Sequence, residues 1–204
     1  TGTDQLLWMQ SLDAFYLTSK LRHSCEWLNR QNISRQEGEA QVELLEPLLQ
    51  YLEEHKEQWA AVPSVLIYFQ IMQCLRDPSE EQHFFGLKSL LETHITRFSQ
   101  SEQARMYAYA QNYCIQKINQ GYAAYFEELF QIYERLLENG VLLHEGVLPH
   151  EHYKNITTVG LRLQKYEWVK SFLECYRKLL HPNFQENAYT YNLCVYFYEQ
   201  RRFK

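Results

Sequence analysis

The stretch of sequence that decides the fold is residues 121–140, GYAAYFEELFQIYERLLENG. Its large apolar side chains recur every three or four positions, at Tyr122, Tyr125, Phe126, Leu129, Phe130, Tyr133, Leu136 and Leu137. This spacing gathers them on one side of an α-helix and lacks the alternation typical of a strand. Gly121 precedes the run and Gly140 follows it, as is typical of helix ends. The stretch therefore predicts one helix of a closely connected pair.

The same pattern extends along the 204-residue chain, which contains only 7 glycines and 5 prolines. Helices are expected over residues 4–29, 42–52, 63–75, 80–98, 101–119, 122–138, 151–163, 166–180 and from 184 to the end. Short polar turns separate most of them, so consecutive helices are expected to pack antiparallel. The sequence predicts an all-α superhelix of about nine helices, stacked as antiparallel hairpins in a single domain over 1–204.

The last third of the chain contains an internal repeat. Tyr166 and Phe203 each follow a short polar turn, and they are 37 positions apart. The side chains before them recur at identical offsets: Ile156, Thr157 and Gly160 before Tyr166, and Leu193, Cys194 and Phe197 before Phe203. In these positions the chain resembles the tetratricopeptide repeat, a pair of helices with small residues where neighbouring helices approach. The resemblance covers residues 101–204; the helix pairs expected in 1–100 show no clear repeat motif.

The resemblance implies a function as well as a fold. Tetratricopeptide-like arrays bind peptides or other proteins on the inner surface formed by the first helix of each pair. The chain is rich in tyrosine, with 16 in all, and tyrosine suits both interhelical packing and peptide contact. By resemblance, the predicted binding positions are Tyr109, Asn112, Gln116, Asn192 and Tyr196. The leading hypothesis is a non-enzymatic protein-protein interaction or scaffolding module.

A second hypothesis follows from the ends of the sequence. The chain starts without a methionine and stops at residues 201–204, inside an expected hairpin. We therefore expect a fragment of a longer chain. In this hypothesis the fragment is a structural or regulatory segment that packs on the remainder of its own polypeptide, and its uncovered apolar surface favours self-association.

A third hypothesis concerns the longest loop of the second half, residues 141–150. His144, Glu145, His150, Glu151 and His152 offer metal ligands or catalytic groups in and beside this loop. They lack the i, i+4 histidine pair with which zinc hydrolases bind one ion, and an exposed polar loop explains them equally well. No glycine-rich phosphate loop or nucleophile motif occurs elsewhere. The sequence therefore predicts neither a cofactor nor a catalytic residue.

Charge and composition limit the partners. Residues 188–193, AYTYNL, are similar to the first helix of pentatricopeptide repeats, which bind RNA, but a net charge of −5 without basic clusters argues against nucleic acid. No apolar run approaches the roughly 20 residues of a membrane-spanning helix. The five cysteines form no C-x-x-C pair and favour free thiols, which points to the cytoplasm.

Overall fold

The computed structural model describes residues 2–34 and 42–200, and side chains over 4–32 and 42–200. Within these residues the chain contains ten α-helices, two short 3-10 helices and no strand, so the predicted all-α fold is confirmed. None of the described helices is long and apolar enough to cross a bilayer. The expected repeat position Phe203 lies outside the described residues.

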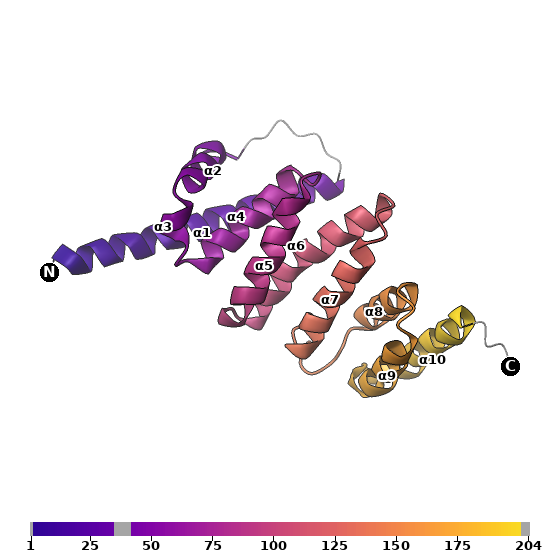
Figure 1. Ribbon diagram of the computed structural model, residues 1–204. Helices are drawn as coiled ribbons and strands as arrows, with labels where there is room; N and C mark the ends of the chain where they lie inside the picture. Colours follow the sequence, from indigo (N-terminus) through magenta and orange to yellow (C-terminus); the bar gives the residue numbers. More distant parts are fainter. Residues whose placement is uncertain (1, 35–41, 201–204) are drawn as a thin grey trace. The chain divides into compact units, whose positions relative to one another are not determined.

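The chain divides into two compact units, Thr1–Ser99 and Gln100–Lys204. The boundary coincides with the start of the region that resembles tetratricopeptide repeats. In the first unit the elements are α1 (Gly2–Ser34), α2 (Leu45–Glu54), α3 (Lys56–Trp59), α4 (Pro63–Arg76), α5 (Glu81–His94) and the 3-10 turn η1 (Ile95–Arg97), which Figure 1 shows in indigo to magenta. The four-residue α3 is the helix that the periodicity did not predict.

The first unit is built around α4, which packs between α1 and α5. Five of its side chains, Val65, Ile67, Tyr68, Ile71 and Met72, are fully buried. They occupy several sides of the helix because neighbours cover it from two directions. The apolar run at residues 65–72 is therefore a core helix.

The α1–α4 pair differs from the expected antiparallel hairpin, because the two helices run parallel. The Thr18 and Ser64 hydroxyls lie 2.9 Å apart, and further along both helices Asn32 donates to the Leu75 carbonyl oxygen at 3.2 Å. The chain between them, which includes α2 and α3, returns to the starting end before α4 begins. The α4–α5 pair is an antiparallel hairpin, as expected, and Gln70 donates across it to the His83 carbonyl oxygen.

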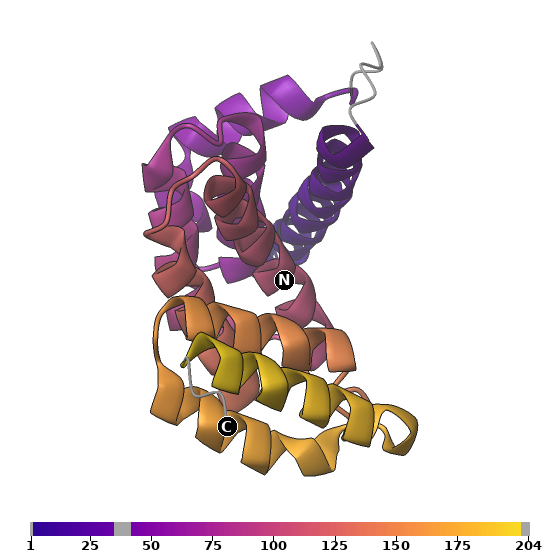
Figure 2. The same ribbon diagram turned by 90° about the vertical axis from the view of Figure 1, so that its right-hand side faces the viewer.

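The second unit contains two hairpins and a final helix. Its elements are α6 (Gln100–Asn119), α7 (Tyr125–Glu138), α8 (His150–Arg162), α9 (Tyr166–Tyr176), the 3-10 turn η2 (Arg177–Leu179) and α10 (Pro182–Glu199). Helix α6 pairs with α7, α8 pairs with α9, and α7 packs on α8. Helix α10 packs on both α8 and α9, and Figure 2 shows these three helices side by side in orange to yellow.

Three helices of this unit end in the same way, with one residue in the left-handed region. Gly121, Gly140 and Gln164 have φ angles of 96°, 64° and 57°. In each case the next amide donates to a carbonyl five residues back, as in the Val141 amide to Leu136 oxygen bond of 2.9 Å. This is the Schellman arrangement, which satisfies the last carbonyls of a helix. Glycine adopts the conformation freely, whereas Gln164 adopts it at a cost.

Tyrosines also pack around the α6–α7 turn. The Lys117 side chain is only 5% exposed, and its ammonium lies 5.1–5.8 Å from the ring centroids of Tyr113, Tyr122 and Tyr125. Each ring offers its negative face to the cation. Part of the tyrosine excess therefore joins α6 to α7 internally.

Helices α8 and α9 approach each other closely at Gly160 of α8. A β-carbon built there would lie 2.5 Å from Val169 Cγ2 and 3.6 Å from the Phe130 ring. Only glycine leaves room for Val169, a β-branched side chain with a restricted χ1 angle. Helices α7, α8 and α9 therefore meet at this residue.

We expect Gly160→Ala to lower the free energy of unfolding by about 1–3 kcal/mol, because the added methyl overpacks the α8–α9 contact. Urea denaturation followed by circular dichroism measures the loss. Thr158→Ala, on the exposed side of α8, is the control and should cost much less. Equal losses in the two variants would contradict the close approach.

Gln164→Gly should raise the free energy of unfolding by about 0.5–1 kcal/mol, since it removes the strain of a left-handed non-glycine residue. Gly140→Ala, at the equivalent position after α7, should have the opposite sign. Thermal melts of the two variants beside the parent chain compare them. A destabilised Gln164→Gly would show that the glutamine side chain contributes more than its backbone strain costs.

Candidate functional site

Three of the five predicted binding positions are buried. Tyr109 of α6 and Asn192 and Tyr196 of α10 were expected to be exposed, and this expectation was wrong. Helix α10 packs on α8 and α9, its Asn192 and Tyr196 side chains are both buried, and the Asn192 amide donates to the Ala188 carbonyl oxygen of the same helix at 2.8 Å. Asn112 and Gln116 of α6 are exposed. These two remain predicted contact positions.

The loop before α8 forms a tight turn. His144 and Val147 exchange two backbone hydrogen bonds of 2.9 Å, and Glu145 and Gly146 between them both have positive φ angles. Two such residues are typical of a type I′ reversal. The Leu148 amide then donates to the Leu179 carbonyl oxygen at 2.7 Å, which ties the loop to the end of η2.

The candidate metal ligands of this loop make separate contacts and do not converge on one point. His150 stacks on the Phe184 ring at 4.5 Å and lies 3.3 Å from the Glu151 carboxylate. His152 is partly buried, and its pKa is lowered by desolvation and by the nearby His144. Among the described residues, no three His, Cys, Asp or Glu side chains are placed to hold one ion. The geometry of His144, Glu145, His150 and His152 is that of a packed turn.

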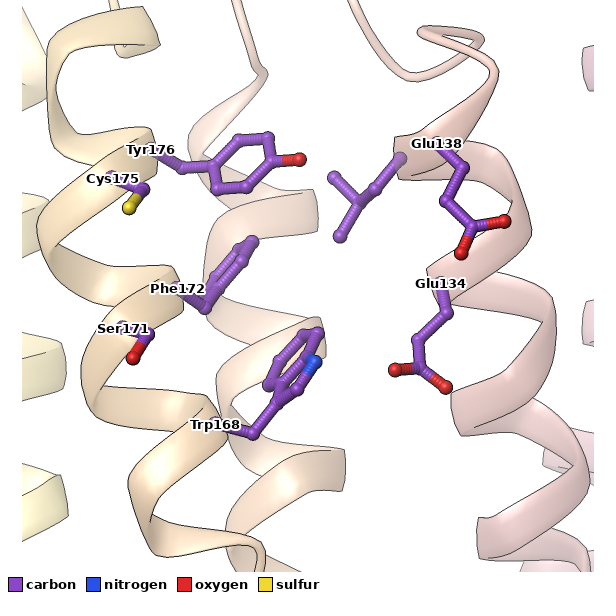
Figure 3. Close-up of a pocket in the computed structure, with 8 residues that line it drawn as sticks. Glu134, Glu138, Trp168, Ser171, Phe172, Cys175 and Tyr176 are labelled. Atoms are coloured by element: carbon purple, nitrogen blue, oxygen red, sulfur yellow. The ribbon is translucent and has the colours of Figure 1, made fainter.

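A surface hollow with an aromatic wall lies between α7 and α9, and we call it the α7–α9 groove. It has a volume of about 260 Å³. Its lining residues are Glu134, Leu137, Glu138, Trp168, Ser171, Phe172, Cys175 and Tyr176. Figure 3 shows the carboxylates on α7 and the aromatic rings on α9, with the Glu134 side chain pointing toward Trp168.

The α9 wall is a ladder of three rings spaced one helical turn apart. The Trp168 and Phe172 rings are parallel to within 7° with centroids 5.3 Å apart, and Tyr176 follows Phe172 at 4.9 Å. Residues at i, i+4 and i+8 lie above one another on a helix, so the rings form a continuous surface. Phe172 is buried, whereas Trp168 and Tyr176 are partly exposed and available for contact.

Side chains of the neighbouring helices α7 and α8 pack against this ladder and hold it in place. The Phe130 ring of α7 meets Trp168 edge-on at 4.7 Å, and Tyr153 of α8 packs against Phe172 at 5.2 Å. The Tyr153 hydroxyl donates to the Leu173 carbonyl oxygen at 2.8 Å. The aromatic wall is thus fixed before any ligand arrives, which reduces the ordering cost of binding.

The α7 wall is acidic. Burial raises the pKa of Glu134 above its ordinary value, an effect that Lys165 and a side-chain hydrogen bond from Trp168 oppose. Lys165 is engaged elsewhere, with its ammonium 3.1 Å from Glu127, and Arg135 lies 3.1 Å from Glu138. Within the described part of the chain no cation lies within 4.0 Å of the Glu134 carboxylate. Glu134 is therefore a partly desolvated anion without an ion-pair partner there.

These groups suit binding better than catalysis. The groove lining contains a hydroxyl, Ser171, and a thiol, Cys175, but no histidine that could activate either of them. It offers aromatic faces beside carboxylates, a combination that attracts cations through both the ring quadrupole and direct charge. A planar, weakly hydrated guanidinium fits such a surface best.

The aromatic ladder was not predicted from the sequence, although the spacing of its residues can be seen there. Residues 166–176, YEWVKSFLECY, carry large apolar side chains on two faces of one helix. Val169 and Leu173 lie on one of these faces, and both are buried. The second face carried no predicted binding position. Its i, i+4, i+8 aromatic spacing at Trp168, Phe172 and Tyr176 was the available clue.

Comparisons with known proteins give no further guide. The chain matches no protein-family model, and neither the curated proteins nor the solved structures contain a significant match to it. The tetratricopeptide resemblance stays a sequence-based prediction, and the groove is interpreted from its own chemistry.

We expect Glu134→Gln to stabilise the fold at neutral pH. A carboxyl with a raised folded-state pKa destabilises the folded protein when ionised, and this penalty disappears as pH falls through the folded pKa toward the unfolded one. Glutamine keeps an oxygen that can accept from Trp168 and carries no charge. Thermal melts at neutral and acidic pH should show the gain at neutral pH only.

Glu174→Gln, on the exposed side of α9, provides the matched removal of one charge. It should leave the melting temperature nearly unchanged at both pH values. If Glu134→Gln instead lowered the melting temperature at neutral pH, the Glu134 charge would be stabilising and the interpretation of its pKa would fail.

Proposed function

We propose that this chain is a non-enzymatic protein-interaction module and that its α7–α9 groove binds an arginine-bearing peptide segment of a partner protein. The observation that carries the proposal is the Glu134 carboxylate, which faces the aromatic ladder and has no cation within 4.0 Å in the described structure, Lys165 being paired with Glu127. Arginine supplies the missing charge and a flat face for Trp168. The pairing of α6 with α7 and of α8 with α9 is consistent with a binding scaffold.

The energetics favour such a ligand. Keeping a carboxylate partly desolvated without a partner costs stability, and a bound guanidinium would recover that cost through a charge-assisted hydrogen bond. A sequence under no functional demand could remove the cost by placing a neutral residue there. Glu134 is thus a residue at which stability and binding oppose each other.

We also propose that the protein acts in the cytoplasm. All five cysteines are free, and three of them, Cys25, Cys74 and Cys114, are buried within the helical units. Free thiols in this number suit a reducing compartment.

The binding proposal is tested with short fluorescent peptides that carry one arginine flanked by apolar residues. Fluorescence anisotropy should show binding, and replacement of arginine by its neutral isostere citrulline should weaken it at least about tenfold. Affinity should also fall as pH decreases through the raised pKa of Glu134, because the protonated carboxyl no longer attracts the cation.

The matched variants decide whether the groove is responsible. Glu134→Gln should weaken arginine-peptide binding about tenfold and abolish its dependence on pH, whereas Glu174→Gln should leave both unchanged. If no arginine peptide binds, or if Glu134→Gln binds the peptide as tightly as Glu174→Gln does, the groove is not a cation site and the proposal is wrong.

A further inference from the structure

The N-terminal part of α1 extends beyond the helices that support the rest of it. Contact with α4 is marked first by the Thr18–Ser64 hydrogen bond near the start of α4, and Leu17 and Leu21 are the first buried side chains of α1. Residues 4–13 before them are all exposed. Figure 1 shows this part of α1, in indigo, projecting past the end of α4.

Five large side chains form an uncovered band on this segment, which we call the outer stripe. They are Trp8, Met9, Leu12, Phe15 and Tyr16, which are 80%, 62%, 64%, 70% and 48% exposed. At about 100° per residue, the five fall within one third of the helix circumference. Leu17, Leu21 and Cys25, which are buried, fall on the opposite face. Helix α1 therefore has one apolar face in the core and a second facing solvent.

The outer stripe is symmetric along the helix. Trp8 and Met9 lie four and three residues before Leu12, and Tyr16 and Phe15 lie four and three residues after it. A twofold axis through Leu12 would place the first pair of one copy level with the second pair of another, with the two Leu12 side chains meeting at the axis. A self-complementary patch of this kind is what an interface between identical subunits requires. We propose that the outer stripe pairs with a second copy of this chain, as an antiparallel two-helix contact centred on Leu12.

The exposed area is sufficient for such a contact. Aromatic side chains bury about 150–250 Å² each, so at their exposed fractions the three rings offer about 400 Å² per copy. With Met9 and Leu12 included, two copies together reach about 1,200 Å², the lower range of specific protein interfaces. Rings and a methionine also dominate the centres of such interfaces.

The spacing of the charges is compatible with the antiparallel direction. In that arrangement Asp4 of one copy is level with Lys20 of the other, each eight residues from Leu12, on opposite edges of the contact. A parallel pair would instead bring Asp4, Asp13 and Lys20 level with their own counterparts. The two acidic residues and the absence of Lys or Arg from residues 4–19 also make an anionic lipid surface a poor alternative.

The first experiment is sedimentation equilibrium of the 204-residue chain. We expect a monomer–dimer equilibrium, and Leu12→Glu should raise the dissociation constant at least about a hundredfold by placing two carboxylates at the twofold axis. Gln10→Glu adds the same charge on the opposite face of α1 and should leave the constant nearly unchanged. Circular dichroism melts should confirm that both variants remain folded, since both positions are exposed.

A second experiment tests the direction of pairing by disulfide capture. In a Cys175→Ser, Cys194→Ser background, which removes the two exposed thiols, Leu12→Cys should form a cross-linked dimer under mild oxidation. Met9→Cys should not, because antiparallel pairing about Leu12 separates the two Met9 positions by about 9 Å along the helices.

The outcomes separate clearly. A chain that stays monomeric at the highest concentration reached overturns the proposal, as does a monomer that binds lipid vesicles through the stripe. A dimer that Leu12→Glu does not weaken would lie elsewhere on the chain. Efficient cross-linking through Met9→Cys would contradict the antiparallel arrangement.

Discussion

The second unit depends on the close approach of α8 to α9 at Gly160. Because Gly160 lacks a β-carbon, Val169 packs directly against the α8 backbone, and Val169 fixes the rotation of α9 about its axis. With Val169 and Leu173 directed inward, the residues on the adjacent face turn toward α7. The aromatic ladder, and with it the candidate binding groove, is thus a consequence of one missing side chain on another helix.

Helix positions were predictable from sequence, whereas helix rotation was not. Residues 121–140 carry apolar side chains on one face, and α7 buries most of that face as expected and ends just before Gly140, although it begins at Tyr125, four residues after Gly121. Helix α10 carries aromatic residues all around, so periodicity could not identify its inner face, and Asn192 and Tyr196 were wrongly expected to be exposed. The parallel α1–α4 pair was also missed, because a hairpin is only the default for consecutive helices and the return through α2 and α3 has no local signal.

In the first unit, two helices with similar patterns of apolar side chains differ in how far those side chains are covered. Helices α1 and α4 each carry apolar side chains on opposite faces. In α4 both faces are covered by helices of the same unit. In the first turns of α1 neither face is, and an isolated helix of that length gains little from its own hydrogen bonds. A contact from outside the unit would bury the apolar side chains of these first turns and so stabilise this part of α1.

The distribution of thiols makes the groove chemically addressable. Burial raises the pKa of Cys25, and that of Cys74 to about 12, so neither forms an appreciable amount of reactive thiolate at neutral pH. Cys175 is exposed and lies in the groove lining, while Cys194 is exposed on α10, outside that lining. A library of disulfide-linked fragments would therefore sample two places on the second unit, and fragments retained at Cys175 but not at Cys194 would report the shape and polarity that the groove prefers. The second unit thereby carries both a probe thiol and a reference thiol, and the nature of a ligand can be explored chemically before any partner is known.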